Sequence, residues 1–378
     1  MGDMMKRLFC ILLSCVLIAL TVAVFHADSV TTSARAFELY CADNGEVLLS
    51  ENADEKLPMA STTKIMTTLL CLEAAAKDNK TVEFTEEMTA EGSSMYLQVG
   101  ERVTLRDLAV GMMMQSGNDA ANAAAIAIAG SIEAFADLMN EKAKEIGMAH
   151  THFVTPSGLD DEEHYSCAHD MALLMAYALQ NEAFAQITSE TSMTVSFVEP
   201  PEKKVTYPNH NKLLKLYEGC IGGKTGYTDR SGRCLVSAAK RDGVTLIAVT
   251  LDDPDDWDDH IGLYTYGFNA LCAAQMPKSG GYTVPLVGAD ADSVTLTCAE
   301  IASAVVPRDQ VKDVHMKVSL PPFVYAPLKK GERVGELVFL LDGEKVACVP
   351  LTVSEAVSYN DKKRDFITYI KDLLHWHS

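Results

Sequence analysis

The chain has 378 residues, of which 48% are hydrophobic and 22% charged, and its formal net charge is −20. This length accommodates one large domain and a smaller one, and the composition is that of a folded chain rather than a disordered one. A nucleic-acid partner is excluded, because the strong negative charge leaves no basic patch to neutralise phosphates.

The first segment is typical of an export signal. Lys6 and Arg7 precede an apolar run over 8–25, and small and polar residues follow. We therefore expect residues 1–36 to be a signal peptide and the protein to act at the outer face of the cytoplasmic membrane or in the cell wall. The run is close to the shortest length of a membrane helix, so an uncleaved anchor stays open.

The cysteines beyond this signal are scattered singly, and the sequence has no Cys-x-x-Cys spacing. Metal binding is therefore not expected, and no cofactor is predicted. Several of these cysteines lie in apolar runs, which favours buried thiols over disulfide bridges.

Up to Thr191 the chain is predicted to be mostly helical. Two strand-like segments, 37–41 and 46–49, flank Asp43-Asn44-Gly45, which is typical of a tight hairpin turn. The apolar run 65–72 then predicts a buried helix. Capping residues and apolar spacing predict further helices after Thr104, where Met112-Met113-Met114 points into a core, and over 118–129, 131–147 and 170–179.

After Thr191 the pattern changes to strands, predicted over 195–198, 220–225, 235–239 and 244–251. Helices inserted between antiparallel strands indicate an α+β domain and not a doubly wound parallel sheet. The acidic run 252–259 lacks the Gly and Glu positions of a calcium loop. We interpret it as the solvated start of a helix.

A domain boundary is expected at 276–281, where Pro and Gly interrupt the pattern. It separates a large domain, 37–275, from a small all-β domain, 276–355. The short strands predicted for the small domain are 294–298, 314–320, 334–341 and 345–349.

The tail, 356–378, is predicted to form an amphipathic helix. A basic cluster at 362–364 precedes apolar residues that share one helical face, namely Phe366, Ile367, Ile370, Leu373 and Leu374. The segment is too short to span a bilayer, so we expect it to lie on an anionic membrane surface. A helix docked on the β domain is the alternative.

The stretch Ser61-Thr62-Thr63-Lys64 is the first indication of chemistry. If Ser61 opens the helix, Lys64 lies about one turn further on, so the hydroxyl and the amine can meet. Free backbone N–H groups and the positive end of the helix dipole also lie near a serine in this place. These are the parts of an activated nucleophile.

Ser-x-x-Lys alone is a weak signal, because a second copy, Ser237-Ala238-Ala239-Lys240, lies inside a strand-like run. The first copy is followed by Ser116-Gly117-Asn118 and then by Lys224-Thr225-Gly226, whereas similar partners of the second copy come in the wrong order. The first trio matches the set known from penicillin-binding proteins and serine β-lactamases.

The groups of this trio have complementary chemistry. Ser61 would attack a carbonyl, and Lys64 would be the base, because desolvation and the nearby Lys224 lower its pKa. Ser116 would pass a proton toward the leaving amine, and Asn118 would hold the substrate amide.

The third motif is expected on an edge strand, where it would bind the substrate. Lys224 and Thr225 would present a cation and a hydroxyl to a substrate carboxylate, and Gly226 would leave room for the substrate backbone.

Taken together, these motifs resemble the low-molecular-mass penicillin-binding proteins, the serine D-alanyl-D-alanine carboxypeptidases. The likeness runs from about Phe37 to Ser354 and includes the segments 57–64, 116–121, 158–159, 209–214, 223–228 and 326–331. The resemblance implies a penicillin-binding/β-lactamase-like transpeptidase domain, with an antiparallel sheet and helices, followed by a small all-β domain.

The resemblance also implies removal of the terminal D-alanine from peptidoglycan stem pentapeptides through an acyl-enzyme on Ser61, with β-lactam antibiotics as inhibitors. By resemblance, the oxyanion hole uses the backbone N–H groups of Ser61 and Tyr227. Two positions depart from the family pattern: Cys167 stands for a common Thr and Thr155 for a usual Asn. Both are expected to lie away from the trio and to affect local packing more than chemistry.

Two other functions stay open. A β-lactamase of the closest type would carry a Glu-x-x-Leu-Asn segment, and none is found between Ser131 and Lys224. A non-catalytic sensor of penicillin-like ligands or glycan is disfavoured by the intact motifs. A Ser-His-Asp hydrolase lacks its Gly-x-Ser-x-Gly segment. Its candidate histidines are interpreted as loop or packing residues: His150, His152, His164, His169 and His210.

Overall fold

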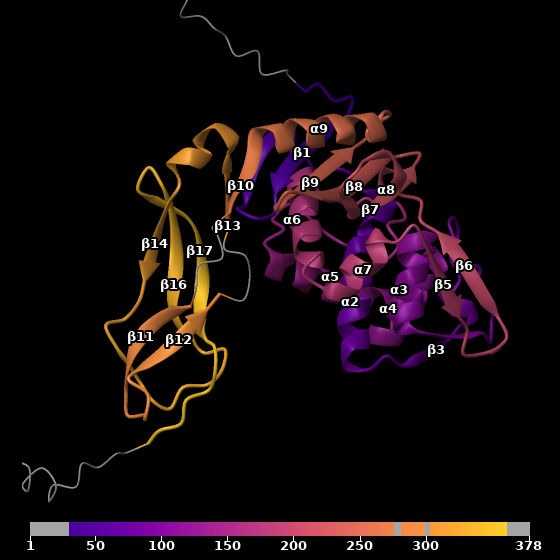
Figure 1. Cartoon of the computed structure of the whole chain (residues 1–378). Coiled ribbons are helices and arrows are strands. Elements are labelled where there is room, and N and C mark those ends of the chain that lie inside the picture. The colour runs from indigo at the N-terminus through magenta and orange to yellow at the C-terminus, as the bar shows by residue number, and fades with distance from the viewer. Residues whose placement is uncertain (1–29, 276–280, 299–302, 361–378) are drawn as a thin grey trace, which may run out of the picture. The chain divides into compact units, whose positions relative to one another are not determined.

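The computed structural model describes residues 30–275, 281–298 and 303–360 (Figure 1). Most of the predicted export signal, residues 276–280 of the expected boundary and the tail from residue 361 onward lie outside the described residues.

An antiparallel sheet of five strands forms the centre of the large domain, in the order β2-β1-β9-β8-β7. Hairpins join β1 to β2 and β8 to β9, with Gly45 and Gly243 at φ values of 78° and 83°, as the turn sequences predict. The order leaves β7 at one edge of the sheet. In the same order, the strand bounds are Glu46–Glu51, Ala36–Cys41, Val244–Leu251, Gly232–Arg241 and Cys220–Thr228.

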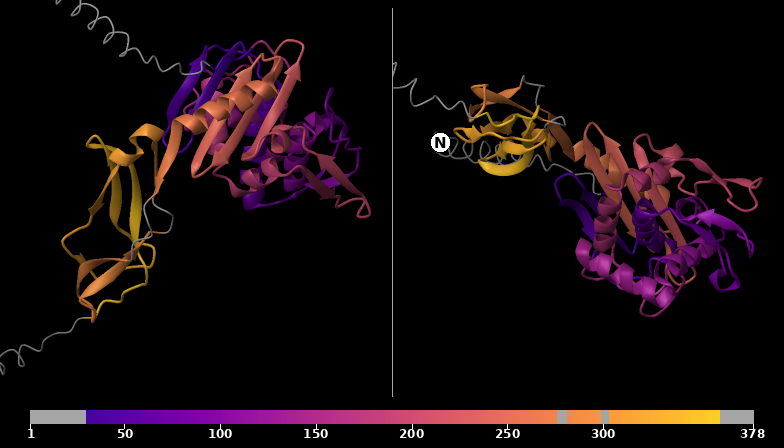
Figure 2. Two further views of the ribbon diagram at one scale, coloured as in Figure 1. Left: turned by 45° about the horizontal axis from the view of Figure 1, so that its top comes forward. Right: turned by 90° about the horizontal axis from the view of Figure 1, so that it is seen from below.

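Helices cover both faces of this sheet. α9 (Asp256–Ala270) lies along one face, and α6 (Ala168–Ala178) packs on the other (Figures 1 and 2). Because it is covered on both faces, β9 is buried along almost its whole length.

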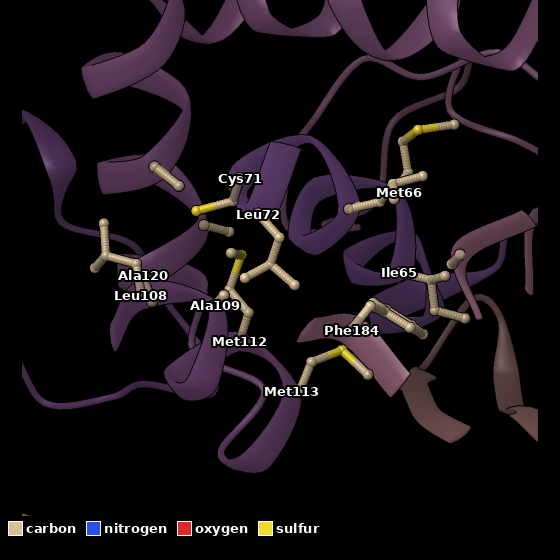
Figure 3. Close-up of a cluster of buried hydrophobic side chains, with 14 of the residues drawn as sticks. Ile65, Met66, Cys71, Leu72, Leu108, Ala109, Met112, Met113, Ala120 and Phe184 are labelled. Atoms are coloured by element: carbon tan, nitrogen blue, oxygen red, sulfur yellow. The ribbon is translucent and has the colours of Figure 1, made fainter. Parts of the chain in front are cut away.

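The remaining helices surround α2 (Lys64–Lys77), which begins directly after the 3-10 turn η1 (Ala60–Thr63). Side chains of α2 such as Ile65 and Leu72 pack with Met112 and Met113 in one apolar cluster (Figure 3). Each such buried side chain contributes roughly 1.5–3 kcal/mol. The other helices are α3 (Leu105–Met114), α4 (Asn118–Ala129), α5 (Ile132–Ile146), α7 (Glu182–Ser189) and α8 (Leu213–Leu216).

The predicted helix ends are confirmed where capping signals exist. Thr104 and Asp107 form a reciprocal capping box at the start of α3, and the Ser131 side chain accepts from the backbone N–H of Ala134 at the start of α5. Gly147 ends α5 at a φ of 94°. Among the described residues no single helix is long and apolar enough to cross a membrane, and only the pair α4 and α5, bent by 86°, passes by length and composition.

Several short elements were not predicted. They include η2 (Glu86–Met88) and two small two-stranded sheets, β3 (Thr81–Glu83) with β4 (Arg102–Thr104) and β5 (Ser192–Ser196) with β6 (Lys204–Pro208). The strand predicted over 195–198 overlaps only the last two residues of β5. Strands of three residues are too short to show an alternating pattern.

The interpretation of the acidic run 252–259 as fully solvated is wrong. The run leads into α9 as predicted, but Asp253 and Asp256 are 0% and 2% exposed, so these two carboxylates are not solvated. Arg233 donates to Asp256 over 2.6 Å, and Ser33 Oγ donates to Asp253 over 2.6 Å. The partners that make burial possible are distant in sequence, and the local pattern gives no sign of them.

The small domain holds a sheet in the order β14-β16-β17-β12-β11-β15, antiparallel except for the β11–β15 pair. Its core contains Val284, Leu296, Phe339 and Leu351. The α+β class and the following all-β domain are confirmed. The strands of this sheet are β14 (His315–Ser319), β16 (Arg333–Leu341), β17 (Glu344–Val353), β12 (Ser293–Thr297), β11 (Tyr282–Val287) and β15 (Val324–Tyr325). A separate two-stranded sheet pairs β10 (Leu271–Gln275) with β13 (Ser303–Pro307), and the 3-10 turn η3 (Arg308–Asp313) follows β13.

Candidate active site

Ser61 lies in η1, one turn ahead of the α-helix, rather than in the first turn of α2. The preceding residue, Ala60, has a φ of 46°, which is unusual for a residue other than glycine. Strand β7 passes close by: a Cβ on Gly226 would lie 3.0 Å from both the Met59 carbonyl oxygen and the Ser61 nitrogen. The glycine of the third motif therefore allows the strand to approach the nucleophile turn.

Lys64 is the first residue of α2 and is fully buried. Its Nζ lies 2.9 Å from Ser61 Oγ, 2.6 Å from Asn118 Oδ1 and 2.6 Å from the carbonyl oxygen of Ser157. The amide and carbonyl oxygens can only accept hydrogen bonds. If a neutral amine gives its two hydrogens to them, its lone pair faces the Ser61 hydroxyl. The geometry therefore suits proton transfer from Ser61 to Lys64.

Burial lowers the pKa of Lys64 well below its ordinary value, and the charge of Lys224 lowers it further. Burial also lowers the pKa of Lys224 to about 7. Because neither amine is solvated, the site holds one positive charge more readily than two. A neutral Lys64 and a cationic Lys224 fit the roles expected from the sequence.

Ser116 and Asn118 stand at the start of α4. Ser116 has a φ of 59°, and its Oγ accepts a hydrogen bond from Lys224 Nζ over 3.0 Å. Asn118 accepts from Lys64 through Oδ1 and donates through Nδ2 to the Glu91 carbonyl oxygen over 2.6 Å. The amide is thus fixed in orientation, with one Nδ2 hydrogen left for a ligand.

The substrate-binding residues expected from the sequence lie together on β7, at the edge of the sheet. Lys224 is buried and also donates to the Thr225 carbonyl oxygen over 2.7 Å. Thr225 is partly exposed, and Tyr227 is 64% exposed with its hydroxyl bonded to Asp229. The strand therefore presents a buried cation and exposed side chains along one line.

Two parts of this arrangement were not found by sequence reasoning. The Ser157 carbonyl belongs to the main chain and has no side-chain signature. The second is Asp119, which fixes the loop at 95–97, because its carboxylate accepts from the backbone N–H groups of Met95 and Leu97 over 2.8 and 3.1 Å. Asp119 directly follows the motif Ser116-Gly117-Asn118, and an acidic residue in the first turn of a helix was the one sequence signal that could have indicated its role.

The two departures from the family pattern differ in their surroundings. Cys167 caps α6, since its sulfur accepts from the backbone N–H of Asp170 over 3.4 Å, so here its effect is local. Thr155 lies two residues before Ser157, and its hydroxyl accepts from the backbone N–H of Gly158 over 3.1 Å. The expectation that Thr155 lies away from the trio is wrong, because this loop holds Lys64.

The second Ser-x-x-Lys copy has no such surroundings. Ser237 lies within β8, and its hydroxyl is bonded to His260 Nδ1 at 2.7 Å and to the Tyr264 hydroxyl at 2.6 Å. Lys240 is exposed near the end of the strand. The interpretation of this copy as structural agrees with these contacts.

One group of potential metal ligands occurs among the described residues: Asp54, His150 and Cys167. The Asp54 carboxylate lies 3.5 Å from His150 Nδ1, and Cys167 is the helix cap described above. These contacts account for the three side chains without a metal. All cysteines of the described residues are free thiols.

Comparison with known proteins identifies the family. The family model described as D-alanyl-D-alanine carboxypeptidase matches residues 23–255, and that of the penicillin-binding protein 5 C-terminal domain matches residues 277–359. The chain belongs to the D-alanyl-D-alanine carboxypeptidase family. It is thus a serine peptidase, and the resemblance seen in its motifs is confirmed.

Individual relatives support the same conclusion for this carboxypeptidase. D-alanyl-D-alanine carboxypeptidase DacF of Bacillus subtilis is 34% identical over 388 positions, covering 97% of both chains. DacC of Escherichia coli is 35% identical, covering 87% of this chain and 86% of its own. Among solved structures, penicillin-binding protein 5 from Haemophilus influenzae is similar with a TM-score of 0.64 and 28% identity, covering 87% of this chain and 98% of that one.

Proposed function

We propose that this carboxypeptidase removes the terminal D-alanine of peptidoglycan stem pentapeptides through an acyl-enzyme on Ser61. The observation that carries the proposal is the buried Lys64 amine, which has two obligate hydrogen-bond acceptors and lies 2.9 Å from the Ser61 hydroxyl. No other lysine–serine pair is joined in this way within the described residues, apart from Lys224 and Ser116 of the same site.

Acylation moves one proton out and back. Lys64 Nζ takes the Ser61 proton as Oγ forms a bond to the carbonyl carbon of the penultimate D-alanine. As the bond to the nitrogen of the last D-alanine breaks, that nitrogen takes the hydroxyl proton of Ser116, whose Oγ lies 3.0 Å from Lys224 Nζ. The proton that Lys64 took from Ser61 then restores the Ser116 hydroxyl, so Lys64 is neutral again. Water then releases the shortened peptide from Ser61, with Lys64 as base.

Substrate recognition rests on β7. The terminal carboxylate binds beside Lys224 and Thr225, and the substrate backbone lies along the strand at Gly226. Backbone N–H groups of Ser61 and Tyr227 stabilise the oxyanion. A β-lactam antibiotic offers a similar carboxylate and a strained amide, so it acylates the same serine.

We further propose that the enzyme is exported and works at the outer face of the cytoplasmic membrane. The support is the predicted signal over residues 1–36 and the amphipathic pattern of the tail. Both lie largely outside the described residues, and the insoluble substrate makes attachment near the wall useful.

Two measurements on the protein without residues 1–36 test the chemistry. The first is D-alanine release from a pentapeptide, which penicillin should stop. The second is mass mapping of the penicillin-labelled peptide, which should contain Ser61. A label on Ser237, or active protein that takes no label, contradicts the acyl-enzyme proposal. Rapid loss of the label with hydrolysed penicillin as product points instead to a β-lactamase.

A further inference from the structure

His164 lies beneath the nucleophile turn and is only 3% exposed. Its Nδ1 accepts hydrogen bonds from the backbone N–H groups of Val154 and Thr155 over 3.0 and 3.2 Å. A ring nitrogen that accepts carries no hydrogen, so the proton of the neutral ring is on Nε2. Nε2 therefore donates to Thr63 Oγ1, which lies 2.9 Å away.

Thr63 connects His164 to Ala60, the residue before the nucleophile. Its hydroxyl donates to the Ala60 carbonyl oxygen over 2.7 Å. Ala60 is held at a φ of 46°, and a non-glycine residue in that region costs on the order of 1–3 kcal/mol. The conformation persists only where surrounding contacts impose it. The His164–Thr63 pair supplies such a contact within one residue of Ser61.

The other side of the imidazole is attached to the loop that positions the base. Val154 and Thr155 open the segment in which the Ser157 carbonyl accepts from Lys64 over 2.6 Å. In the same segment, the Pro156 carbonyl accepts from Thr67 over 2.6 Å. One side chain thus joins the turn that carries the nucleophile to the loop that fixes its base.

His164 is not placed to exchange protons with the substrate. Both ring nitrogens are occupied by Thr63 and the loop backbone, and the ring packs edge-on against Phe153 at 5.9 Å between centroids. Burial also lowers the pKa of His164 to about 4. The ring therefore stays neutral near neutral pH, with one fixed tautomer.

We propose that His164 is a positioning residue for acylation: its Nε2–H to Thr63 hydrogen bond keeps Ser61 and Lys64 in register for proton transfer. The inference rests on the proposed acyl-enzyme mechanism. It concerns a histidine that the sequence pattern assigns only to packing.

The test uses conservative and disruptive changes at both ends of the hydrogen bond. Gln at position 164 can place an amide donor near Nε2, whereas Asn can replace only the Nδ1 acceptor. At the other end, Thr63→Ser keeps the hydroxyl and Thr63→Val removes it. The measured quantity is the limiting first-order rate of penicillin acylation, separated from the penicillin dissociation constant. This rate does not depend on the fraction of folded enzyme.

We expect His164→Asn and Thr63→Val each to lower the limiting acylation rate by roughly 10- to 100-fold, as small misplacements of reacting groups do. Penicillin binding before acylation should change less than about threefold. His164→Gln and Thr63→Ser should recover most of the rate. The double variant His164→Asn/Thr63→Val should be no slower than the slower single variant, because both changes remove one interaction.

His260→Asn is the matched control. His260 is also a fully buried histidine, but it is bonded to Ser237 and Thr250, outside the site. The His260→Asn variant should have a lower melting temperature and an unchanged acylation rate. An unchanged rate in His164→Asn, or additive losses in the double variant, overturns the inference. The inference is also overturned if the pH profile of the acylation rate loses one of its limbs in His164→Asn, because that result would mean that the His164 ring transfers a proton. Failure of the wild-type protein to label at Ser61 instead refutes the underlying mechanism.

Discussion

Lys64 differs from a surface lysine because its side chain is shielded from bulk solvent. Its side chain is fully buried, and its three polar partners are a hydroxyl, an amide oxygen and a carbonyl oxygen, none of them anionic. An ammonium in this place loses its hydration without gaining an ion pair. The free amine that general-base catalysis requires is therefore the favoured form.

Replacing Lys64 by Met removes the base while keeping most of the side-chain volume. We expect the second-order rate of penicillin acylation to fall by at least about 10²–10⁴, the usual effect of losing a general base. Met is chosen over Ala because a smaller side chain would leave a cavity in a buried position. The assay is labelling by a fluorescent penicillin, with thermal unfolding measured alongside. Near-normal labelling at neutral pH excludes Lys64 as the base.

The two lysines predict a bell-shaped pH dependence. Acylation should rise with pH as Lys64 loses its proton, and the lowered pKa of this group places that limb below the range of ordinary lysines. It should fall as Lys224, whose pKa is about 7 in the free enzyme, loses the charge that binds the carboxylate.

Bound ligand should move the second of these limbs. A carboxylate beside Lys224 favours its charged form, so at saturating penicillin the alkaline limb shifts to higher pH. The comparison is between the second-order rate constant, which reports the free enzyme, and the limiting rate, which reports the complex. An alkaline limb at the same pH in both profiles would contradict the assignment of Lys224.

At the scale of secondary-structure elements, the loop 154–158 matters as much as the motif-bearing helices. Gly158 has a φ of 83°, and a Cβ there would lie 1.9 Å from the Ala60 carbonyl oxygen. The loop and η1 can approach this closely only because the side chain is absent. Gly158 thus belongs to the contact between the base-holding loop and the nucleophile turn.

Gly158→Ala should therefore damage acylation, whereas Gly147→Ala should not. Both glycines have positive φ, which costs an alanine about 1–2 kcal/mol, but nothing lies within 4 Å of a Cβ on Gly147. We expect both variants to unfold at lower temperature. Only Gly158→Ala should also lose acylation rate, on the order of 10-fold or more, because Ala60 must move. Equal acylation rates in the two variants would show that the close approach is unimportant.

Prediction from sequence succeeded where an element carries its own end signals. The capping box at Thr104, the Ser131 cap and the Gly147 stop placed α3 and α5 closely. It failed where long-range contacts decide the structure. The buried carboxylates of Asp253 and Asp256 depend on Ser33 and Arg233, and three-residue strands such as β3 exist only through their partners.

The same distinction holds within the site. Its motif residues were predictable because their chemistry requires particular side chains at fixed spacings along the chain. His164 was not, since it acts on Thr63, 101 residues away, and a single histidine in a loop has no distinctive pattern. The Ser157 contribution comes from a carbonyl group that every residue type possesses.

For the whole molecule, we propose that the tail supplies membrane attachment and not catalysis. Deletion of residues 361–378 from protein lacking residues 1–36 should abolish binding to anionic liposomes and leave D-alanine release from a soluble peptide unchanged. The deletion spares Asn360, whose side chain donates to Asp290 over 2.8 Å. Neutral liposomes serve as the control. A large fall in thermal stability, or liposome binding that survives, would favour a helix docked on the protein.

The edge position of β7 has a consequence for solubility. An unpaired sheet edge can recruit strands from other copies of the same protein, and natural proteins blunt such edges with β-bulges or inward-facing charges. Strand β7 has both features: its pairing with β8 shifts register between Cys220 and Gly222, and Lys224 is a buried, ionisable side chain within the strand. We therefore expect that the strand proposed to bind a short peptide also resists edge-to-edge aggregation of these molecules at high protein concentration.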